Sequence, residues 1–352
     1  MNERTERMLH KLSDTHTLCE EEYLYLLTHR DTQAEQCAAA LAADVRRRVY
    51  GNHVYVRGLI EISNICKNNC YYCGIRAGNA RCERYRLTEE EILTCCREGY
   101  ALGFRTFVLQ GGEDGYFTDE RLCALLRTIK REHPDCAVTL SLGERSRESY
   151  RMLREAGADR YLLRHETADP THYGMLHPSE MSHANRLRCL TELKELGYQV
   201  GCGFMVGSPF QTDAHLAKDL KFAETFRPHM CGIGPFIPHR DTDFADKAAG
   251  SVSLTCYLLS LVRLALPDVL LPATTALGTM DPAGREKGIL AGANVVMPNL
   301  SPESVRAKYA LYDGKLSSGA ESAQQLTDLC RRMNTIGYEV VTDRGDAKRH
   351  GI

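Results

Sequence analysis

The stretch VYVRGLIEISNICKNNCYYC (residues 54–73) joins a strand pattern to three closely spaced cysteines. Its first part, VYVRGLIEI (54–62), is rich in β-branched and aromatic residues, which predicts a buried strand. Cys66, Cys70 and Cys73 follow within the span 66–73. Thiolates are soft ligands that suit iron–sulfur clusters and zinc. The sequence therefore predicts a metal-binding loop directly after a strand.

Short strand patterns alternate with longer amphipathic stretches from this point onward. The expected strands are 54–62, 106–110, 137–142, 159–166, 198–206, 230–236, 269–275 and 293–298. The expected helices are 88–102, 119–132, 146–156, 184–196, 212–226, 253–266, 283–290 and one that starts near Pro302. Such units over about 250 residues predict an α/β fold, a closed (β/α)8 barrel of the TIM type. A doubly wound open sheet is disfavoured because no G-x-G-x-x-G motif follows the first strand.

The first fifty residues read as helices that precede the barrel. Thr32 and Glu35 have the spacing of a capping box, and Gly51 is placed to end a helix. We expect three parts: an N-terminal helical extension (1–51), the barrel (52–315), and a C-terminal helix and tail that close the barrel (316–352).

The loops expected after the strands carry the polar, glycine-rich and cysteine-rich segments. They include CKNNCYYC, GGED, SLGE, RHET, GSPFQT, PFIPHRDT, TTALGT and MPNLSP. In a (β/α)8 barrel the active site is built from these loops, at the carboxyl ends of the strands. The sequence therefore predicts that they meet around one site.

Composition narrows the class of protein. A net charge of −2 gives no reason to expect nucleic acid or an anionic membrane as a partner. The charged start lacks the apolar core of a secretory signal, and no apolar run reaches the length of a membrane span, so a cytoplasmic location is expected. Fifteen cysteines then argue against a disulfide framework, and they suit an anaerobic organism. Most of the others, such as Cys95, Cys96, Cys123, Cys189 and Cys256, fit small buried hydrophobes in helices.

The cysteine loop alone allows three interpretations. Three thiolates can hold a 4Fe–4S cubane with one iron left open, whereas a structural zinc site is usually closed by four ligands. Cys82 is nine residues further on and no His lies between Cys66 and Cys82, although a distant ligand such as His165 can complete a zinc site. The third interpretation is an accidental group in a cysteine-rich chain.

The spacing C-x3-C-x2-C, with Tyr72 just before the last cysteine, resembles the signature of the radical S-adenosylmethionine (SAM) superfamily. The resemblance implies that the open iron chelates the amino and carboxylate groups of SAM. It implies that one electron from the cluster then breaks the sulfur–C5′ bond and gives a 5′-deoxyadenosyl radical. The cofactor supplies this chemistry, and the protein supplies orientation and exclusion of water.

Several longer strings narrow the resemblance. EISNICKNNCYYCGIRAGN, VLQGGED, DRYLLRHETADP, GIGPFIPHRDT and LPATTALGT are similar to the HydE family of FeFe-hydrogenase maturases. The resemblance implies a role in building the diiron subcluster of the hydrogenase, with an organometallic iron–cysteine precursor as substrate. It also implies transient contact with other hydrogenase maturases and with a reducing electron donor. The alternatives are a reaction of the biotin synthase or methylornithine synthase type, a non-enzymatic electron carrier, and a zinc-stabilised protein.

The family's cofactor-binding residues have matching positions in this sequence, namely Tyr72, Gly111, Gly112, Glu113, Ser141, Glu166 and Arg186. The resemblance implies that the backbone of 111–113 meets the methionyl amino group and that Ser141 touches SAM. It implies that Glu166 accepts the ribose hydroxyls and that Arg186 pairs with the SAM carboxylate. Without the resemblance, Glu166 is an acid at a helix start and Arg186 a charge on a helix surface.

A second set is expected to line the barrel interior below SAM, namely Gln110, Thr139, Arg164, Thr274, Thr275, Met297 and Tyr309. The resemblance implies that Arg164 and the threonine pair bind an anion, such as a carboxylate or a cyanide-bearing ligand. Threonine is otherwise a good strand former, and Met297 fits a core residue. Arg164 is more telling because a buried arginine requires a partner. If Arg164 pairs only with Glu166, the expectation of an anion site is weakened.

The C-terminal part departs from some relatives, which carry a second cluster on three cysteines there. In KLSSGAESAQQLTDLCRRM (315–333), Ser317 stands where the first such cysteine is expected, and Cys330 is the one cysteine of the segment. One thiol cannot hold a cluster. We therefore expect a single 4Fe–4S cluster, on Cys66, Cys70 and Cys73.

Overall fold

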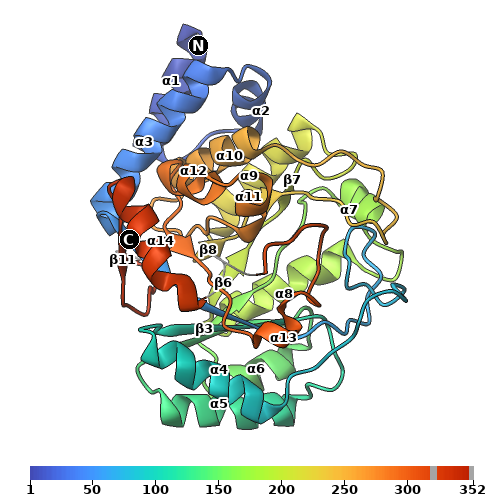
Figure 1. Ribbon diagram of the computed structural model, residues 1–352. Coiled ribbons are helices and arrows are strands. Elements are labelled where there is room, and N and C mark those ends of the chain that lie inside the picture. Colours follow the sequence, from blue (N-terminus) through green and yellow to red (C-terminus); the bar gives the residue numbers. More distant parts are fainter. Residues whose placement is uncertain (318–322, 349–352) are drawn as a thin grey trace.

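Parallel strands close into a barrel in the computed structural model, which describes residues 1–317 and 323–348 (Figure 1). The strands are β1 (His53–Val56), β2 (Gly58–Ser63), β3 (Thr106–Gly111), β4 (Ala137–Ser141), β5 (Arg160–Leu162), β6 (Gln199–Cys202), β7 (Met205–Val206), β8 (Met230–Cys231), β9 (Gly234–Pro235), β10 (Val295–Val296) and β11 (Glu339–Val341). One sheet has the order β2-β3-β4-β5-β6-β8, and another joins β10 to β1. Single bridges from Met230 to Leu270 and from Pro272 to Val295 complete the ring. The predicted (β/α)8 barrel is confirmed.

Four of the predicted strands are interrupted, and the sixth of them divides into β8 and β9. The first divides at Arg57, so that β1 pairs with β10 while β2 pairs with β3. The fifth divides into β6 and β7 at Gly203, whose φ of 153° lies outside ordinary strand geometry. The seventh is reduced to bridges at Leu270 and Pro272, because proline has no N–H to donate to a ladder. These interruptions bend the strands without opening the ring.

Helices cover the outside of the barrel. They are α4 (Glu89–Ala101), α5 (Asp119–Glu132), α6 (Arg147–Glu155), α7 (Pro170–Leu176), α8 (His183–Glu195), α9 (Asp213–Phe226), α10 (Val252–Ala265), α11 (Thr275–Met280), α12 (Gly284–Leu290), α13 (Glu303–Arg306) and α14 (Leu326–Thr335). Six of them begin after a Ser or Thr whose hydroxyl accepts a hydrogen bond from a free N–H of the first turn. At α4 the predicted capping box of Thr88 and Glu91 is present.

Three helices precede the barrel: α1 (Glu3–Thr15), α2 (Glu20–Thr28) and α3 (Thr32–Tyr50). They lie on one side of it, where α3 packs on α10 and α2 on α9 (Figure 1). The predicted capping box of Thr32 and Glu35 is wrong, because Asp31 is the N-cap and its carboxylate accepts from the N–H of Ala34. Gly51 ends α3 as expected, with a φ of 60°.

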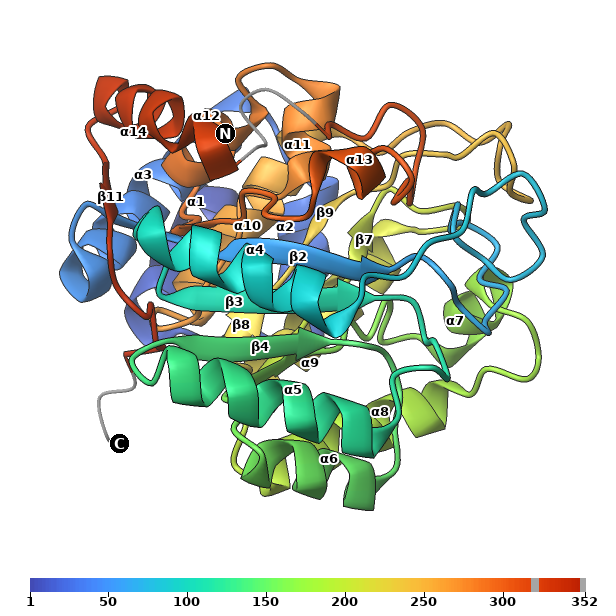
Figure 2. The same ribbon diagram turned by 60° about the horizontal axis from the view of Figure 1, so that its bottom comes forward.

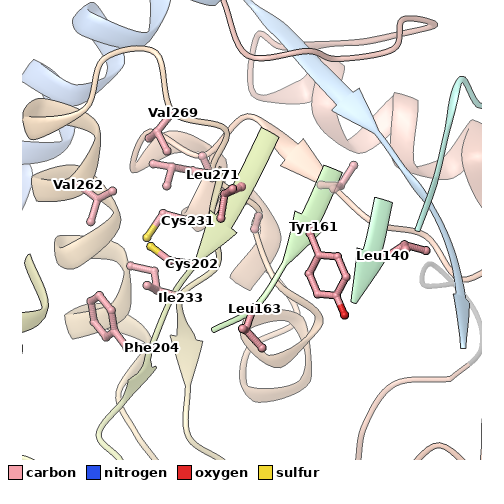
Figure 3. Close-up of a cluster of buried hydrophobic side chains, with 14 of the residues drawn as sticks. Leu140, Tyr161, Leu163, Cys202, Phe204, Cys231, Ile233, Val262, Val269 and Leu271 are labelled. Carbon is pink, nitrogen blue, oxygen red and sulfur yellow. The ribbon is translucent and has the colours of Figure 1, made fainter. Parts of the chain in front are cut away.

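The outer faces of the strands form an apolar core with the surrounding helices. Figure 3 shows one part of it, where Cys202 of β6 and Cys231 of β8 lie next to each other beneath Val262 of α10. Both thiols are fully buried among aliphatic side chains. The cysteines predicted as small hydrophobes likewise sit in helices, where Cys95, Cys96, Cys123 and Cys189 are buried and Cys256 is half-buried.

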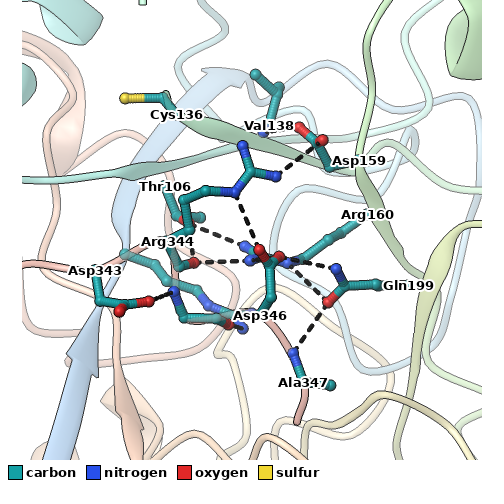
Figure 4. A network of polar contacts seen from close by, with 12 residues as sticks. Thr106, Cys136, Val138, Asp159, Arg160, Gln199, Asp343, Arg344, Asp346 and Ala347 are labelled. Carbon is teal, nitrogen blue, oxygen red and sulfur yellow. Dashed lines mark hydrogen bonds and ion pairs between the residues drawn. The ribbon is translucent and has the colours of Figure 1, made fainter. Parts of the chain in front are cut away.

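Polar side chains fill the barrel at the amino ends of its strands, where residues 343–347 cross the opening (Figure 4). The buried guanidinium of Arg160 donates to the carbonyl of Arg344 at 2.7 Å and pairs with Asp346 at 2.5 Å. Gln199 donates to the same carboxylate at 2.8 Å. The adjoining strand β11 pairs with β1. The C-terminal segment thus occupies the end opposite the cysteine loop.

The opposite end gathers the loops that follow the strands. Figure 2 shows β2, β3 and β4 side by side with α4, α5 and α6 outside them, and their loops meet at one end together with α7. Within the part of the chain that the structure describes, no helix is both long enough and apolar enough to cross a membrane.

Candidate functional site

The three motif cysteines lie on the loop that follows β2, at the carboxyl end of the barrel, and all three are half-buried. A turn closes between two of them, where the N–H of Cys73 donates to the carbonyl of Cys70 at 3.3 Å. The next residue, Gly74, donates to the carbonyl of Leu311 at 2.9 Å. The loop is therefore held in place by the chain that returns after the last strand.

The environment of the thiols favours their neutral form in the absence of a metal. Burial raises the pKa of Cys66, and it raises that of Cys73 to about 12. Burial also raises the pKa of Cys70, with further contributions from Cys73 and Cys66, so the three thiols are close enough to repel one another as thiolates. Metal binding at this loop must therefore displace protons.

A glycine lets the loop after β3 touch the cysteine loop. The N–H of Gly112 donates to the carbonyl of Ser63 at 3.1 Å. A Cβ atom on Gly112 would lie 2.3 Å from the carbonyl oxygen of Ile65 and 2.7 Å from the Cβ of Cys66. A side chain at this position therefore cannot be accommodated without moving the cysteine loop. Gly111 ends β3 directly before it.

Glu113 connects three loops. Its backbone carbonyl accepts from the N–H of Lys67 at 3.1 Å, and its carboxylate lies 3.1 Å from the Lys67 ammonium. The same carboxylate accepts from the N–H of Glu144, in the loop after β4, at 2.9 Å. Gly143, with a φ of 75°, makes room for it. Glu113 thus fixes the cysteine loop through its side chain as well as its backbone.

Glu166 follows β5 in a left-handed conformation, with a φ of 67°. Its N–H donates to the carbonyl of Gly203 at 3.0 Å. Its side chain is almost fully buried, and Oε2 has no hydrogen-bond partner. Arg164 is 3.6 Å from this oxygen, so the two residues form an ion pair. Arg164 therefore pairs with Glu166, and this pairing weakens the expectation of a separate anion site at Arg164.

Arg186 of α8 reaches the same region. Its Nε donates to the carboxylate of Glu144 at 2.5 Å, and its Nη1 donates to the carbonyl of Arg164 at 2.7 Å. Burial works against the charge of this guanidinium, but Tyr173 and Glu144 raise its pKa above the usual value. Arg186 is buried rather than a charge on a helix surface, and its guanidinium is held by the loops after β4 and β5.

The cysteines, Glu166 and Arg186 come together in space. Both Arg186 and Glu166 contribute to the electrostatic environment of the Cys70 thiol. Of the remaining predicted residues, Ser141 is half-buried at the end of β4, opposite Gln110 in the ladder. The hydroxyl of Tyr72 is 3.1 Å from Nε2 of His177.

The second predicted set is spread over the barrel interior. Gln110 donates to the hydroxyl of the buried Tyr309 at 3.4 Å. The hydroxyls of Thr139 and Thr274 are buried without a hydrogen-bond partner, whereas Thr275 begins α11. Met297 follows β10 and packs against apolar residues that include Tyr55 and Leu270. The structure therefore brings Gln110 and Tyr309 into contact and places Met297 with the core.

Sequence reasoning missed a buried network beside this set. Glu61 of β2 is fully buried, pairs with Lys315 at 2.7 Å and accepts from the amide of Asn299 at 2.9 Å. The Lys315 ammonium also lies 5.1 Å above the ring of Tyr309. The available signal was a glutamate in an otherwise apolar strand, since such a residue is almost never buried without a partner.

The residues of this site fit an iron–sulfur cluster that carries a nucleoside ligand. Three thiols on one loop can each bind one iron of a cubane. Within residues 1–317 and 323–348, no group of three or more His, Cys, Asp or Glu side chains is arranged around a single metal-ion position, the three motif cysteines included. Buried oxygens without partners, such as Oε2 of Glu166 and the hydroxyl of Thr139, are the groups that a bound ligand would satisfy.

Comparison with known proteins agrees with this reading. Residues 60–223 match the family model of the radical SAM superfamily. The chain is 44% identical over 323 residues, 92% of each chain, to the FeFe hydrogenase maturase subunit HydE of Thermotoga maritima. It is 27% identical to the 3-methylornithine synthase of Methanosarcina acetivorans, over 96% of this chain and 94% of that one. The crystal structure of a methylornithine synthase has a TM-score of 0.83 at 27% identity and covers 95% of this chain and 97% of its own.

The match to HydE extends far beyond the cysteine motif and covers almost the whole of both chains. The chain therefore belongs to the radical SAM superfamily and, within it, to the family of the FeFe hydrogenase maturase subunit HydE.

Proposed function

We propose that this chain uses Cys66, Cys70 and Cys73 to hold one 4Fe–4S cluster, and that it acts with SAM in assembly of the diiron subcluster of FeFe hydrogenase. Enzymes of the radical SAM superfamily use such a cluster and SAM. The bound pair supplies one-electron cleavage of SAM, which gives a 5′-deoxyadenosyl radical. The observation that carries the proposal is that the cysteine loop follows β2 and Glu166 follows β5 at the same end of the barrel, where Arg186 donates to the carbonyl of Arg164.

Residues of this chain bind and orient SAM in the proposal. Arg186, fixed by Glu144, pairs with the SAM carboxylate. Glu166 accepts the ribose hydroxyls through its buried Oε2, which has no hydrogen-bond partner and lies 3.6 Å from Arg164. The backbone of 111–113 meets the methionyl amino group, where Gly112 permits close approach.

Two further residues take part in the same proposal. Ser141 touches SAM from the end of β4, where it is half-buried. Tyr72 packs beside the cluster, with its hydroxyl held by His177.

The substrate lies below SAM in the proposal. An organometallic iron–cysteine precursor is the class that the HydE family implies, and the barrel interior offers Gln110, Tyr309 and the unpartnered hydroxyls of Thr139 and Thr274. The ion pair of Arg164 with Glu166 lowers the support for a free anion site there. The proposal includes transient contact with other hydrogenase maturases and with a reducing electron donor, and a location in the cytoplasm.

The test is activation of an immature FeFe hydrogenase by the reconstituted protein together with the other maturases. Hydrogen evolution that depends on this chain, and that is lost in Cys70→Ala, supports the proposal. The same preparation, with SAM and dithionite, is also assayed for the reactions of 3-methylornithine synthase and biotin synthase. Formation of 3-methylornithine or biotin, without activation of the hydrogenase, would overturn the proposal in favour of the relatives' reactions.

A further inference from the structure

Glu166 owes its unusual backbone to its neighbours. A left-handed φ of 67° is unfavourable for a residue with a Cβ atom, so surrounding contacts must impose it. One contact is the hydrogen bond from its N–H to the carbonyl of Gly203. Gly203 is itself constrained, because a Cβ atom there would lie 2.0 Å from the carbonyl oxygen of Gly232. The position of Glu166 therefore depends on what holds Gly203.

The imidazole of His165 holds Gly203. The N–H of Gly203 donates to Nδ1 of His165 at 3.2 Å. A backbone N–H can only donate, so Nδ1 is the acceptor and the ring proton is on Nε2. The ring is fully buried, with centroids 4.5 Å from Phe222 and 5.7 Å from Phe204. This packing fixes the plane of the ring and the direction of Nδ1.

Asp219 of α9 lies on the other side of the ring, close to Nε2 but without a hydrogen bond to it. Its carboxylate is fully buried, and Oδ1 lies 3.4 Å from Nε2 of His165. The same oxygen accepts from the N–H of Ala168 at 2.6 Å. One carboxylate therefore contacts the ring of His165 and is hydrogen-bonded to the chain at residue 168, on either side of Glu166.

Burial opposes a charge on both side chains of this pair. Burial lowers the pKa of His165 to about 3, and burial raises the pKa of Asp219 well above its usual range. Glu166, Arg164 and Arg186 are the charged groups that act on the imidazole.

We propose that His165 and Asp219 are positioning residues that hold the backbone of Glu166 so that its carboxylate faces the ribose hydroxyls of SAM. The inference rests on the proposed contact between Glu166 and the ribose. His165 and Asp219 act through Glu166 and Gly203 and do not touch SAM. Their loss therefore weakens recognition of the ribose before it affects the cluster.

The test measures ribose recognition by binding. Anaerobic calorimetry compares SAM with its 2′-deoxyadenosyl analogue on the reconstituted enzyme. The wild type is expected to prefer SAM by about tenfold or more, the range for a hydrogen bond to a charged group. In His165→Phe, which keeps the ring packing but removes Nδ1, the preference is expected to fall to about twofold or less, with iron content unchanged.

Four further variants sharpen the result. His165→Asn offers an amide oxygen to Gly203 and is expected to restore the preference. Asp219→Asn retains an acceptor for Ala168 and keeps the preference, whereas Asp219→Leu loses it. His133→Phe is the matched control, because His133 is also buried beside two aromatic rings, Tyr100 and Phe107, and its ring nitrogens have no hydrogen-bond partner.

Each outcome decides between the two proposals. If Glu166→Gln loses the preference while His165→Phe and Asp219→Leu keep it, the positioning role is wrong and the ribose contact stands. If Glu166→Gln keeps the preference, the ribose contact itself is wrong. An equal loss in His133→Phe would reduce the effect to general destabilisation and overturn the positioning role.

Discussion

Gly112→Ala is the substitution that acts most directly on the cysteine loop. The added Cβ would lie 2.3 Å from the carbonyl oxygen of Ile65, whereas real Cβ contacts under 3.0 Å essentially do not occur, so the loop must move by about 0.7 Å. The loop cannot slide freely, because Lys67 is bonded to Glu113 and Gly74 to Leu311. A shift of about 1 Å at a reacting group can cost about a hundredfold in rate. We expect SAM cleavage to fall by about tenfold to a hundredfold.

The assay measures 5′-deoxyadenosine formed from SAM and dithionite by the anaerobically reconstituted protein. Overpacking of this kind also costs about 1–3 kcal/mol of stability, so thermal unfolding is measured in parallel. Gly115→Ala is the matched control, since it adds the same methyl group to the same loop, where nothing lies within 4 Å. Cleavage at the wild-type rate in Gly112→Ala, or an equal loss in Gly115→Ala, would refute the reasoning.

Three further predictions concern ion pairs. Burial opposes ionisation of Asp346, but Arg160 and the residues beside it lower its pKa to about 2 from 3.8, so its contribution is present above pH 4 and is lost as the pH falls toward 2. Asp346→Asn should cost about 1 kcal/mol at pH 7, with screening of this partly exposed pair included, and less at pH 3; an equal loss in urea unfolding at both would contradict this. Lys315→Met leaves Glu61 buried without its cation and should cost about 3–5 kcal/mol. Burial raises the pKa of Glu61, so that loss should grow as the pH rises above 4.5, and equal unfolding free energies at pH 5 and 8 would count against it. Glu144→Gln removes the charge that holds Arg186 and should weaken SAM binding about tenfold at unchanged iron content; an unaltered dissociation constant would exclude this role.

Local patterns in the sequence were enough to predict the barrel. The alternation of strand and helix periods identified the units, and the Thr88 capping box marked the start of α4 correctly. The break at Gly203 and the shortened strand around Pro272 were missed, because strand limits depend on which neighbours pair across the barrel. The pairing of β11 with β1 joins residues almost three hundred positions apart, and no local signal specifies it.

The candidate site, like the fold, was predicted only in part: its local motifs were predicted from the sequence, and its long-range contacts were not. The cysteine spacing is local, and the resemblance assigned Glu166 and Arg186 to positions that the structure brings near Cys70. Their supporting residues were not predicted. Glu144 lies in a loop and Asp219 on a helix, and their partners are set by tertiary packing rather than by sequence spacing.

The pairing of Arg164 with Glu166 was foreseen as the case that weakens an anion site, and the structure has that pairing. Cys330 is half-buried on α14. Residues 318–322, which belong to the segment where some relatives carry a second cluster, lie outside the described residues. A single cluster therefore stays a prediction that iron analysis can decide.

Iron content and SAM cleavage, measured on the same reconstituted preparations, test the role of the three cysteines most directly. The wild type should bind about four irons per chain and form 5′-deoxyadenosine with dithionite. Cys70→Ala should lose both, whereas Cys82→Ala, which removes a half-buried thiol from the same loop, should keep both. About eight irons per chain, a zinc-loaded protein without cleavage, or cleavage retained in Cys70→Ala would contradict a single cluster held by Cys66, Cys70 and Cys73.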